Sequence, residues 1–310
     1  MIKKTLYFSN PAYLSCEKEQ MVIEMPSITK AKTHPSIQQK GVLTRPIEDL
    51  GVIVLDHPQI TLTHGLIDKL LANRTAIVTC SKNHLPFGLC LPLYGNTTQN
   101  ERFRKQLTAS LPLQKQLWQQ TVQQKIRNQA EVLRRFTSEK ATNLDAWARE
   151  VRSGDSTNLE ARAAAYYWKT LFPEVEQFTR EREGESPNNF LNYGYAILRA
   201  VVARALVITG LLPTLGIHHH NKYNAYCLAD DIMEPYRPYV DKLVIRLTRK
   251  YGYVKELDQK IKAELLAIPT LDVHINQQRT PLLVGVSQTT ASLYQCFAGE
   301  SRKIDYPLLQ

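Results

Sequence analysis

Residues 215–238 read LGIHHHNKYNAYCLADDIMEPYRP and place three consecutive histidines shortly before the carboxylates Asp230, Asp231 and Glu234. A helix that begins near Ala229 would put Glu234 one turn beyond the two aspartates, on a shared face. Adjacent histidines diverge in a strand or a loop, so one or two of them can point at a common centre. This stretch predicts a metal site at a helix entrance.

The ligand types leave the ion open. Two imidazoles and a carboxylate could hold zinc, whereas one imidazole with two or more carboxylates favours manganese or magnesium. Two structural alternatives remain at this point. The histidine run could be a surface loop, and Asp230 could serve only the start of the helix, as an N-cap or a first-turn acid. Pro235 suits a first turn, and Pro238 predicts some irregularity.

A second candidate, Glu160, opens the apolar helical stretch NLEARAAAYYW at residues 158–168. Its small residues would let another backbone approach closely. Glu160 could equally be a structural acid, because Thr157-x-x-Glu160 matches a capping box. Together with the histidine–acid stretch, it suggests a metal-dependent enzyme that acts on nucleic acid.

The pattern of apolar residues predicts an α+β chain with a small β-rich domain at residues 1–95 and a larger all-α domain at 96–310. Strands are expected at 5–8, 21–24, 52–55, 76–79 and 85–91, with one helix at 65–72. Helices are expected at 112–136, 159–172, 188–209, 230–250, 255–267 and 286–298. The candidate metal residues thus fall in the helical domain.

The net charge of +10 agrees with a DNA-binding protein without proving one. Residues 101–150 carry 10 basic and 5 acidic side chains, half of the excess. In the helix predicted there, Trp118, Val122, Ile126, Ala130 and Leu133 recur at helical spacing. The cations that fall mostly on the other faces would form either a solvated surface or a DNA track; they are Lys115, Lys125, Arg127, Arg134 and Arg135.

The 310 residues, 43% of them hydrophobic, suffice for two domains with substantial cores. The five cysteines are scattered and lack C-x-x-C spacing, which suits reduced thiols in a cytosol. The N-terminus has too short an apolar run for a signal peptide. The most apolar stretch, residues 196–217, contains Arg199, Arg204 and Pro213, which favours a buried helix over a membrane span.

Several runs closely resemble the CRISPR-associated adaptation integrases, the first-numbered Cas proteins, in their type II branch. They are NLEARAAAYYW, FLNYGYAILRAVVARALVITGLLPTLGIHHHN, LADDIMEPYRPYVDKLV and the C-terminal SLYQCFAGESRKIDYPLL. These runs match the family in their order, their spacing and their residue types. The resemblance runs from about Leu159 to the C-terminus, with a weaker echo in the N-terminal strands.

This resemblance implies that Glu160, His219 and Glu234 are catalytic residues that bind Mg²⁺ or Mn²⁺. Gly216 fixes the register, since the family's metal histidine follows that glycine by three residues. Glu234 stands where many other branches carry aspartate. Asp231 would bind the ion directly, bind it through water, or orient His219. His218 and His220 have no ligand counterpart and are assigned to DNA contact or to the surface.

The resemblance also implies a reaction and an assembly. The 3′-hydroxyl of a short DNA duplex would attack a phosphodiester of a CRISPR repeat and insert a new spacer. The β-rich domains would pair into a homodimer, and two dimers would flank a dimer of a small ferredoxin-like CRISPR adaptation partner in a hetero-hexamer. The expected location is the cytoplasm of a prokaryote.

Position alone makes four cations candidates for DNA contact: Arg162, Lys222, Arg237 and Arg246. Ion pairing with site carboxylates, or plain exposure to solvent, is the alternative for each. Two other functions remain. One is a stand-alone metal nuclease that cuts branched DNA, with water as the nucleophile. The other is a non-catalytic DNA-binding scaffold.

Overall fold

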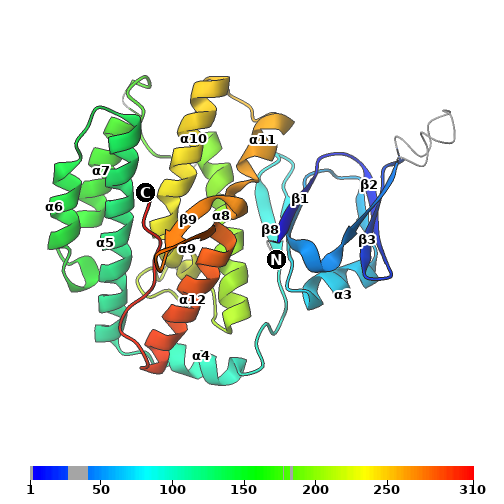
Figure 1. Ribbon diagram of the computed structural model, residues 1–310, viewed down its shortest axis with the longest axis horizontal. Coiled ribbons are helices and arrows are strands. Elements are labelled where there is room, and N and C mark those ends of the chain that lie inside the picture. Colours follow the sequence, from blue (N-terminus) through cyan, green and yellow to red (C-terminus); the bar gives the residue numbers. More distant parts are fainter. Residues whose placement is uncertain (1–2, 27–40, 177, 182–183) are drawn as a thin grey trace. The chain divides into compact units, whose positions relative to one another are not determined.

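The computed structural model describes residues 3–26, 41–176, 178–181 and 184–310 (Figure 1). The chain divides into two compact units, Met1–Leu93 and Tyr94–Gln310. The predicted boundary after residue 95 lies two residues beyond this division. Strands dominate the first unit and helices the second, so the predicted α+β class is confirmed.

The first unit contains two four-stranded sheets, with strand orders β1-β5-β7-β8 and β4-β3-β2-β6. The elements are β1 (Lys4–Phe8), β2 (Ala12–Glu17), β3 (Gln20–Glu24), β4 (Val42–Pro46), β5 (Leu50–Leu55), β6 (Ile60–Leu62), α3 (His64–Ala72), β7 (Ala76–Cys80) and β8 (Pro86–Cys90). Five of these strands were predicted from the sequence, and β2, β4 and β6 were missed.

The core of this unit forms where α3 packs against strands. Strand β5 pairs in parallel with both β1 and β7, and its run LGVIVL is almost wholly buried, as expected of a central parallel strand. Leu66 and Leu70 of α3 join Leu14, Met21 and Leu50 in the core. The helix begins where Thr63 accepts a hydrogen bond from the Leu66 amide.

The second unit is helical except for one hairpin. Its helices are α4 (Gln99–Leu107), α5 (Leu111–Phe136), α6 (Thr142–Glu150), α7 (Leu159–Leu171), α8 (Asn188–Thr209), α9 (Cys227–Met233), α10 (Arg237–Tyr251), α11 (Gln259–Leu265) and α12 (Leu282–Ala298). The prediction of an all-α domain missed β9 (Asp272–Ile275) and β10 (Gln278–Pro281), which form an antiparallel pair. The prediction also missed α4 and α6.

The helix predicted at 230–250 is broken in the structure. Helix α9 ends at Met233, a 3₁₀ turn covers Glu234–Tyr236, and α10 starts at Arg237. Pro235 and Pro238 lack amide protons and cannot continue the hydrogen bonding of a regular α-helix. The predicted irregularity is therefore confirmed, and it sets Glu234 apart on a turn of its own.

Helix α5 is the longest element and lies beside α6, α7 and α10 (Figure 1). Its start is fixed by Ser110, which accepts a hydrogen bond from the Leu113 amide, and by a proline in the first turn. The predicted stripe of Trp118, Val122, Ile126, Ala130 and Leu133 is buried throughout. The apolar face of α5 was thus correctly predicted.

Helix α8 forms much of the core. Among the residues that the structure describes, it is the one helix long and apolar enough to cross a membrane. In the fold, 72% of that apolar window is buried inside the protein, and α8 packs against α9, α10 and α12. This burial agrees with the predicted core helix.

A buried carboxylate joins three helices. Asp241 of α10 accepts hydrogen bonds from Tyr167 of α7, at 2.8 Å, and from Tyr195 of α8. Asp241 is 1% exposed and Tyr167 is fully buried. Burial raises the pKa of Asp241, and the hydrogen bonds from the two tyrosines lower it. Burial has the larger effect, so the pKa is about 6. The network fixes α7 relative to α10.

We expect Asp241 to make stability depend on pH. The carboxyl favours folding while it is neutral, and this contribution is lost as the pH rises through about 6, where the buried group must ionise. The quantity to compare is the difference in unfolding free energy between the wild type and Asp241→Asn. This difference should fall by about 2–3 kcal/mol between about pH 4 and pH 7. Urea denaturation at several pH values measures this difference; a difference independent of pH contradicts the assignment.

Candidate active site

Glu160 lies in the first turn of α7, and a different carboxylate caps that helix. Asp155 accepts hydrogen bonds from the amides of Leu159 and Glu160, each at 2.9 Å. In the described part of the chain, the residue preceding α7 makes no side-chain capping bond. The capping-box alternative for Thr157 and Glu160 is therefore wrong, and the Glu160 carboxylate is available for another partner.

Glu234 is held on its 3₁₀ turn by α5. Asn128 donates a hydrogen bond of 2.7 Å to the carbonyl of Pro235, the residue after Glu234. The same asparagine binds the carbonyl of Pro307 and the amide of Leu309. One side chain of α5 thus secures both the broken helix and the C-terminal segment, which leaves Glu234 buried at 5% exposure.

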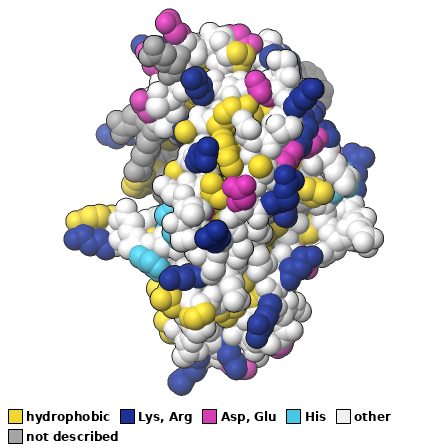
Figure 2. All heavy atoms as spheres, turned by 90° about the vertical axis from the view of Figure 1, so that its left-hand side faces the viewer, with side chains coloured by type: hydrophobic (Ala, Val, Ile, Leu, Met, Phe, Trp, Pro, Cys, Tyr) yellow, Lys and Arg dark blue, Asp and Glu magenta, His cyan; other side chains and the backbone are white. Residues whose placement is uncertain are grey.

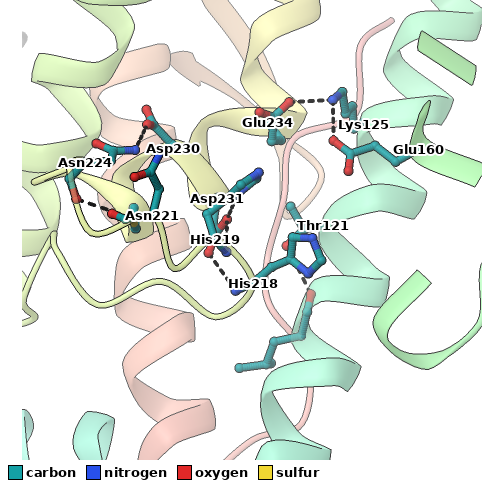
Figure 3. Close-up of polar contacts among 12 residues, drawn as sticks. Thr121, Lys125, Glu160, His218, His219, Asn221, Asn224, Asp230, Asp231 and Glu234 are labelled. Atoms are coloured by element: carbon teal, nitrogen blue, oxygen red, sulfur yellow. Dashed lines mark hydrogen bonds and ion pairs between the residues drawn. The ribbon is translucent and has the colours of Figure 1, made fainter. Parts of the chain in front are cut away.

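Glu160 and Glu234 meet at Lys125 of α5 (Figure 3). The Lys125 ammonium lies 2.6 Å from Glu160 Oε1 and 2.7 Å from Glu234 Oε2. The second cation at Glu234 is Arg237, whose Nε is 2.9 Å from Oε1. Carboxylates from two distant parts of the sequence are therefore brought together. The lysine between them was predicted to lie on another face of α5, as part of either a solvated surface or a DNA track.

The charges in this cluster support one another. Burial alone would raise the pKa of Glu234, but Arg237 and Lys125 outweigh it and hold the pKa below its usual value. Burial alone would lower the pKa of Lys125, but Glu234 and Glu160 outweigh it and raise the pKa. Glu234 and Lys125 are thus both charged near neutral pH.

His219 is oriented by Asp231. Its Nδ1 is hydrogen-bonded to Asp231 Oδ1, and Asp231 also accepts the backbone amide of His218 at 2.9 Å. Asp231 is fully buried, so its oxygens serve these partners. The Nδ1 contact leaves Nε2 of His219 as the nitrogen that can bind an ion. Of the three roles left open for Asp231, this geometry favours orienting His219.

The neighbouring histidines take different positions. The His218 ring stacks on Trp118 of α5, with ring centroids 4.1 Å apart, and the His219 ring meets the edge of the same indole. His220 is exposed. Trp118 therefore fixes the loop against α5, and His218 contributes packing, in addition to the surface role assigned to it from sequence.

Asp230 has a structural partner of its own. It pairs with Arg199 of α8, with Nε 2.6 Å from Oδ1, and it accepts a hydrogen bond from Asn224. It lies in the first turn of α9 but does not cap that helix, whose N-cap is Tyr226. Asp230 therefore has a structural role, as one alternative predicted. Its partners are Arg199 of α8 and Asn224 in the loop before α9.

The donor set fits a hard divalent ion. Among the described residues, no three His, Cys, Asp or Glu side chains are close enough to enclose an ion as they stand. Glu234 Oε2, however, is a buried oxygen whose neighbour in the described chain is the Lys125 ammonium, a cation at the place where a metal ion would bind. Two carboxylates and an oriented imidazole are suitable donors for Mg²⁺ or Mn²⁺. Glu160, His219 and Glu234 could thus hold such an ion once Lys125 no longer separates the carboxylates.

The four candidate DNA contacts divide into two groups. Arg162, Lys222 and Arg246 are exposed, whereas Arg237 is directed to Glu234 and is 24% exposed. The alternative of ion pairing with a site carboxylate therefore describes Arg237. Figure 2 shows Lys and Arg side chains spread over the face that carries α5, α6 and α7. This face suits contact with a polyanion along its length.

Four residues have roles at the site that the sequence did not reveal: Lys125, Asn128, Asp155 and Trp118. Lys125 was assigned with other cations to the outer faces of α5, because helical periodicity places a Cα but not the end of a long side chain. One signal was present: Lys125 follows Val122 by three residues and Trp118 by seven, spacings that put it on the same helix face as part of the buried stripe. Asn128 offers no comparable signal, because its partners are carbonyls far away in the sequence.

The chain has a strand-rich unit followed by a helical unit, and the helical unit gathers two glutamates and a His–Asp pair. Comparison with known proteins identifies this combination as that of the CRISPR-associated endonucleases and integrases. The family whose description is "CRISPR associated protein Cas1" matches residues 6–266. The chain belongs to this Cas1 family.

Individual relatives agree with that assignment. CRISPR-associated endonuclease Cas1 of Neisseria meningitidis is 36% identical over 293 residues, which cover 94% of this chain and 91% of the relative. A casposase bound to its integration product has the same fold, with a TM-score of 0.77 at 16% identity, covering 98% of this chain and 93% of that one. A chain of a Cas6-RT-Cas1–Cas2 complex matches with a TM-score of 0.74 at 16% identity, covering 99% of this chain and 36% of that one.

The His219–Asp231 pair generates a prediction. The hydrogen bond to Asp231 is the main cause that raises the pKa of His219, so Asp231→Asn should lower that pKa. Asp230→Asn is the matched control, because Asp230 is the adjacent carboxylate but binds Arg199 instead. Titration of the His219 ring protons by NMR measures both. An unchanged His219 pKa in Asp231→Asn would show that Asp231 does not orient the imidazole.

Proposed function

We propose that this protein is the integrase of CRISPR spacer acquisition, in a type II system. It would join the 3′-hydroxyl of a short DNA duplex to a phosphodiester of the CRISPR repeat by metal-dependent transesterification. The observation that carries the proposal is the meeting of Glu160 and Glu234, from α7 and the turn before α10, beside an imidazole fixed by Asp231. The casposase relative, bound to an integration product, supports the reaction class.

Glu160, His219 and Glu234 would hold the ion, which we propose to be Mg²⁺ or Mn²⁺. When bound, such an ion lowers the pKa of the attacking hydroxyl and neutralises charge on the phosphate oxygens. Asp231 would keep the His219 ring in one orientation. Arg237, paired with Glu234, would hold that carboxylate in its ionised form.

We also propose the partners that the resemblance implied. The β-rich unit would form a homodimer, and a small ferredoxin-like adaptation protein would join two such dimers in a hetero-hexamer on DNA. The complex named Cas6-RT-Cas1–Cas2, which contains a chain of the same fold, supports a Cas partner. The proposed location is the cytoplasm of a prokaryotic cell, where the repeat array lies.

A nuclease that cuts branched DNA is the second candidate, since the relative from Neisseria meningitidis is named an endonuclease. The same ligands would serve it, with water in place of the 3′-hydroxyl as nucleophile. The products separate the two functions. A rejoined strand of new length shows strand transfer, whereas shortened strands alone show hydrolysis. Binding without any product would favour the non-catalytic scaffold.

We predict that Glu160→Ala, His219→Ala and Glu234→Ala each lower strand transfer at least about a hundredfold, because each removes a donor to the ion. DNA affinity should change little, since phosphate contacts lie elsewhere on the surface. The assay uses branched DNA with Mn²⁺, Mg²⁺ or a chelator, with products resolved by length.

Glu150→Ala is the control for that series, because Glu150 is an exposed carboxylate at the end of α6. It should retain wild-type activity. Full activity in any one of the three site variants would remove that residue from the ligand set, and equal activity in chelator would exclude the metal-dependent reaction.

A further inference from the structure

Lys125 occupies the point where the two proposed metal carboxylates meet (Figure 3). Its Nζ is 2.6 Å from Glu160 Oε1 and 2.7 Å from Glu234 Oε2, and its side chain is only 12% exposed. Water therefore contributes little to solvating the ammonium. Lys125 and the two carboxylates stabilise one another, because each charge would be costly to bury without the others.

The ammonium of Lys125 contacts both carboxylates. It donates a hydrogen bond to Glu160 and forms a close ion pair with Glu234 Oε2. Its charge and its hydrogen bonding both lower the pKa of Glu234. Because an ammonium is a compact charge on a flexible stem, it can leave these oxygens when a divalent ion binds them.

The charges also balance as they stand. Lys125 and Arg237 supply two positive charges beside the two carboxylates. A divalent ion bound to both carboxylates would lie next to the ammonium, and like charges at that separation repel strongly in surroundings that exclude water. Lys125 and the ion therefore compete for the same oxygens.

Resting on the proposed metal-dependent function, we propose that Lys125 is an internal competitor of the divalent ion. Its ammonium holds Glu160 and Glu234 together in the metal-free protein and is displaced when the ion binds both. A structural salt bridge and an internal competitor make opposite predictions. Removal of a merely structural lysine would weaken metal binding or leave it unchanged, whereas removal of a competitor strengthens it.

The first test is calorimetric titration of the full chain with Mn²⁺ in the absence of DNA. Lys125→Met removes the ammonium and keeps most of the length of the side chain. Arg127→Met is the matched control, since Arg127 is an exposed cation two residues further along α5. We expect Lys125→Met to bind Mn²⁺ about tenfold more tightly than wild type, or more, and Arg127→Met to bind like wild type.

The outcomes separate this proposal from the proposed function. If Lys125→Met binds Mn²⁺ with wild-type or lower affinity, Lys125 is not a competitor, while the metal site itself stands. If neither wild type nor Lys125→Met binds Mn²⁺, the metal site fails and the proposal fails with it. If His219→Ala also weakens the tighter binding of Lys125→Met, the ion is at the proposed ligands.

A second test uses the wild-type protein, in case Lys125→Met does not fold. Acetylation of lysines by an amine-reactive ester, followed by mass spectrometry, reports how accessible each ammonium is. Saturating Mn²⁺ should raise the labelling rate of Lys125 several-fold, because displacement takes it out of its ion pairs. Exposed Lys105 of α4 should label equally with and without Mn²⁺. No change at Lys125, in protein shown by calorimetry to bind Mn²⁺, would overturn the proposal.

Discussion

The pairing of two carboxylates with one lysine is the constraint on which this helical unit depends. Glu234 is buried and Glu160 is partly buried, and a charged group removed from water is costly unless a cation lies beside it. Helix α5 supplies Lys125, which contacts both. Much of the local structure positions the two glutamates beside Lys125 of α5.

Three positioning contacts have this effect, and each acts on a different element. Asp155 sets the first turn of α7, which carries Glu160. Asn128 anchors the proline-broken turn that carries Glu234, and Asp241 of α10 ties that helix to α7 through Tyr167 and to α8 through Tyr195. The reacting groups are thus mounted on packed helices, while only the histidine loop relies on a buried carboxylate and a stacked indole. Rigid support of this kind would suit the proposed phosphoryl transfer.

Much of this architecture could be predicted from the sequence, because it follows from local pattern. The apolar stripe of α5 and the broken helix at Pro235 come from periodicity and proline chemistry, and Glu160 and Glu234 came from a family resemblance. Contacts between distant residues could not be predicted. Lys125 was placed on another face of α5, the cap of α7 from Asp155 was not foreseen beside the capping-box alternative at Thr157, and the β9–β10 hairpin was missed.

The central claim is that Glu160, His219 and Glu234 bind one divalent ion. Anomalous diffraction from crystals of the protein soaked in Mn²⁺ tests it most directly, since it locates the ion without reference to activity. The account predicts a single strong peak bonded to these three side chains, with the Lys125 ammonium moved away from Glu234. A peak bonded to other residues, or no peak at saturating Mn²⁺, would contradict it.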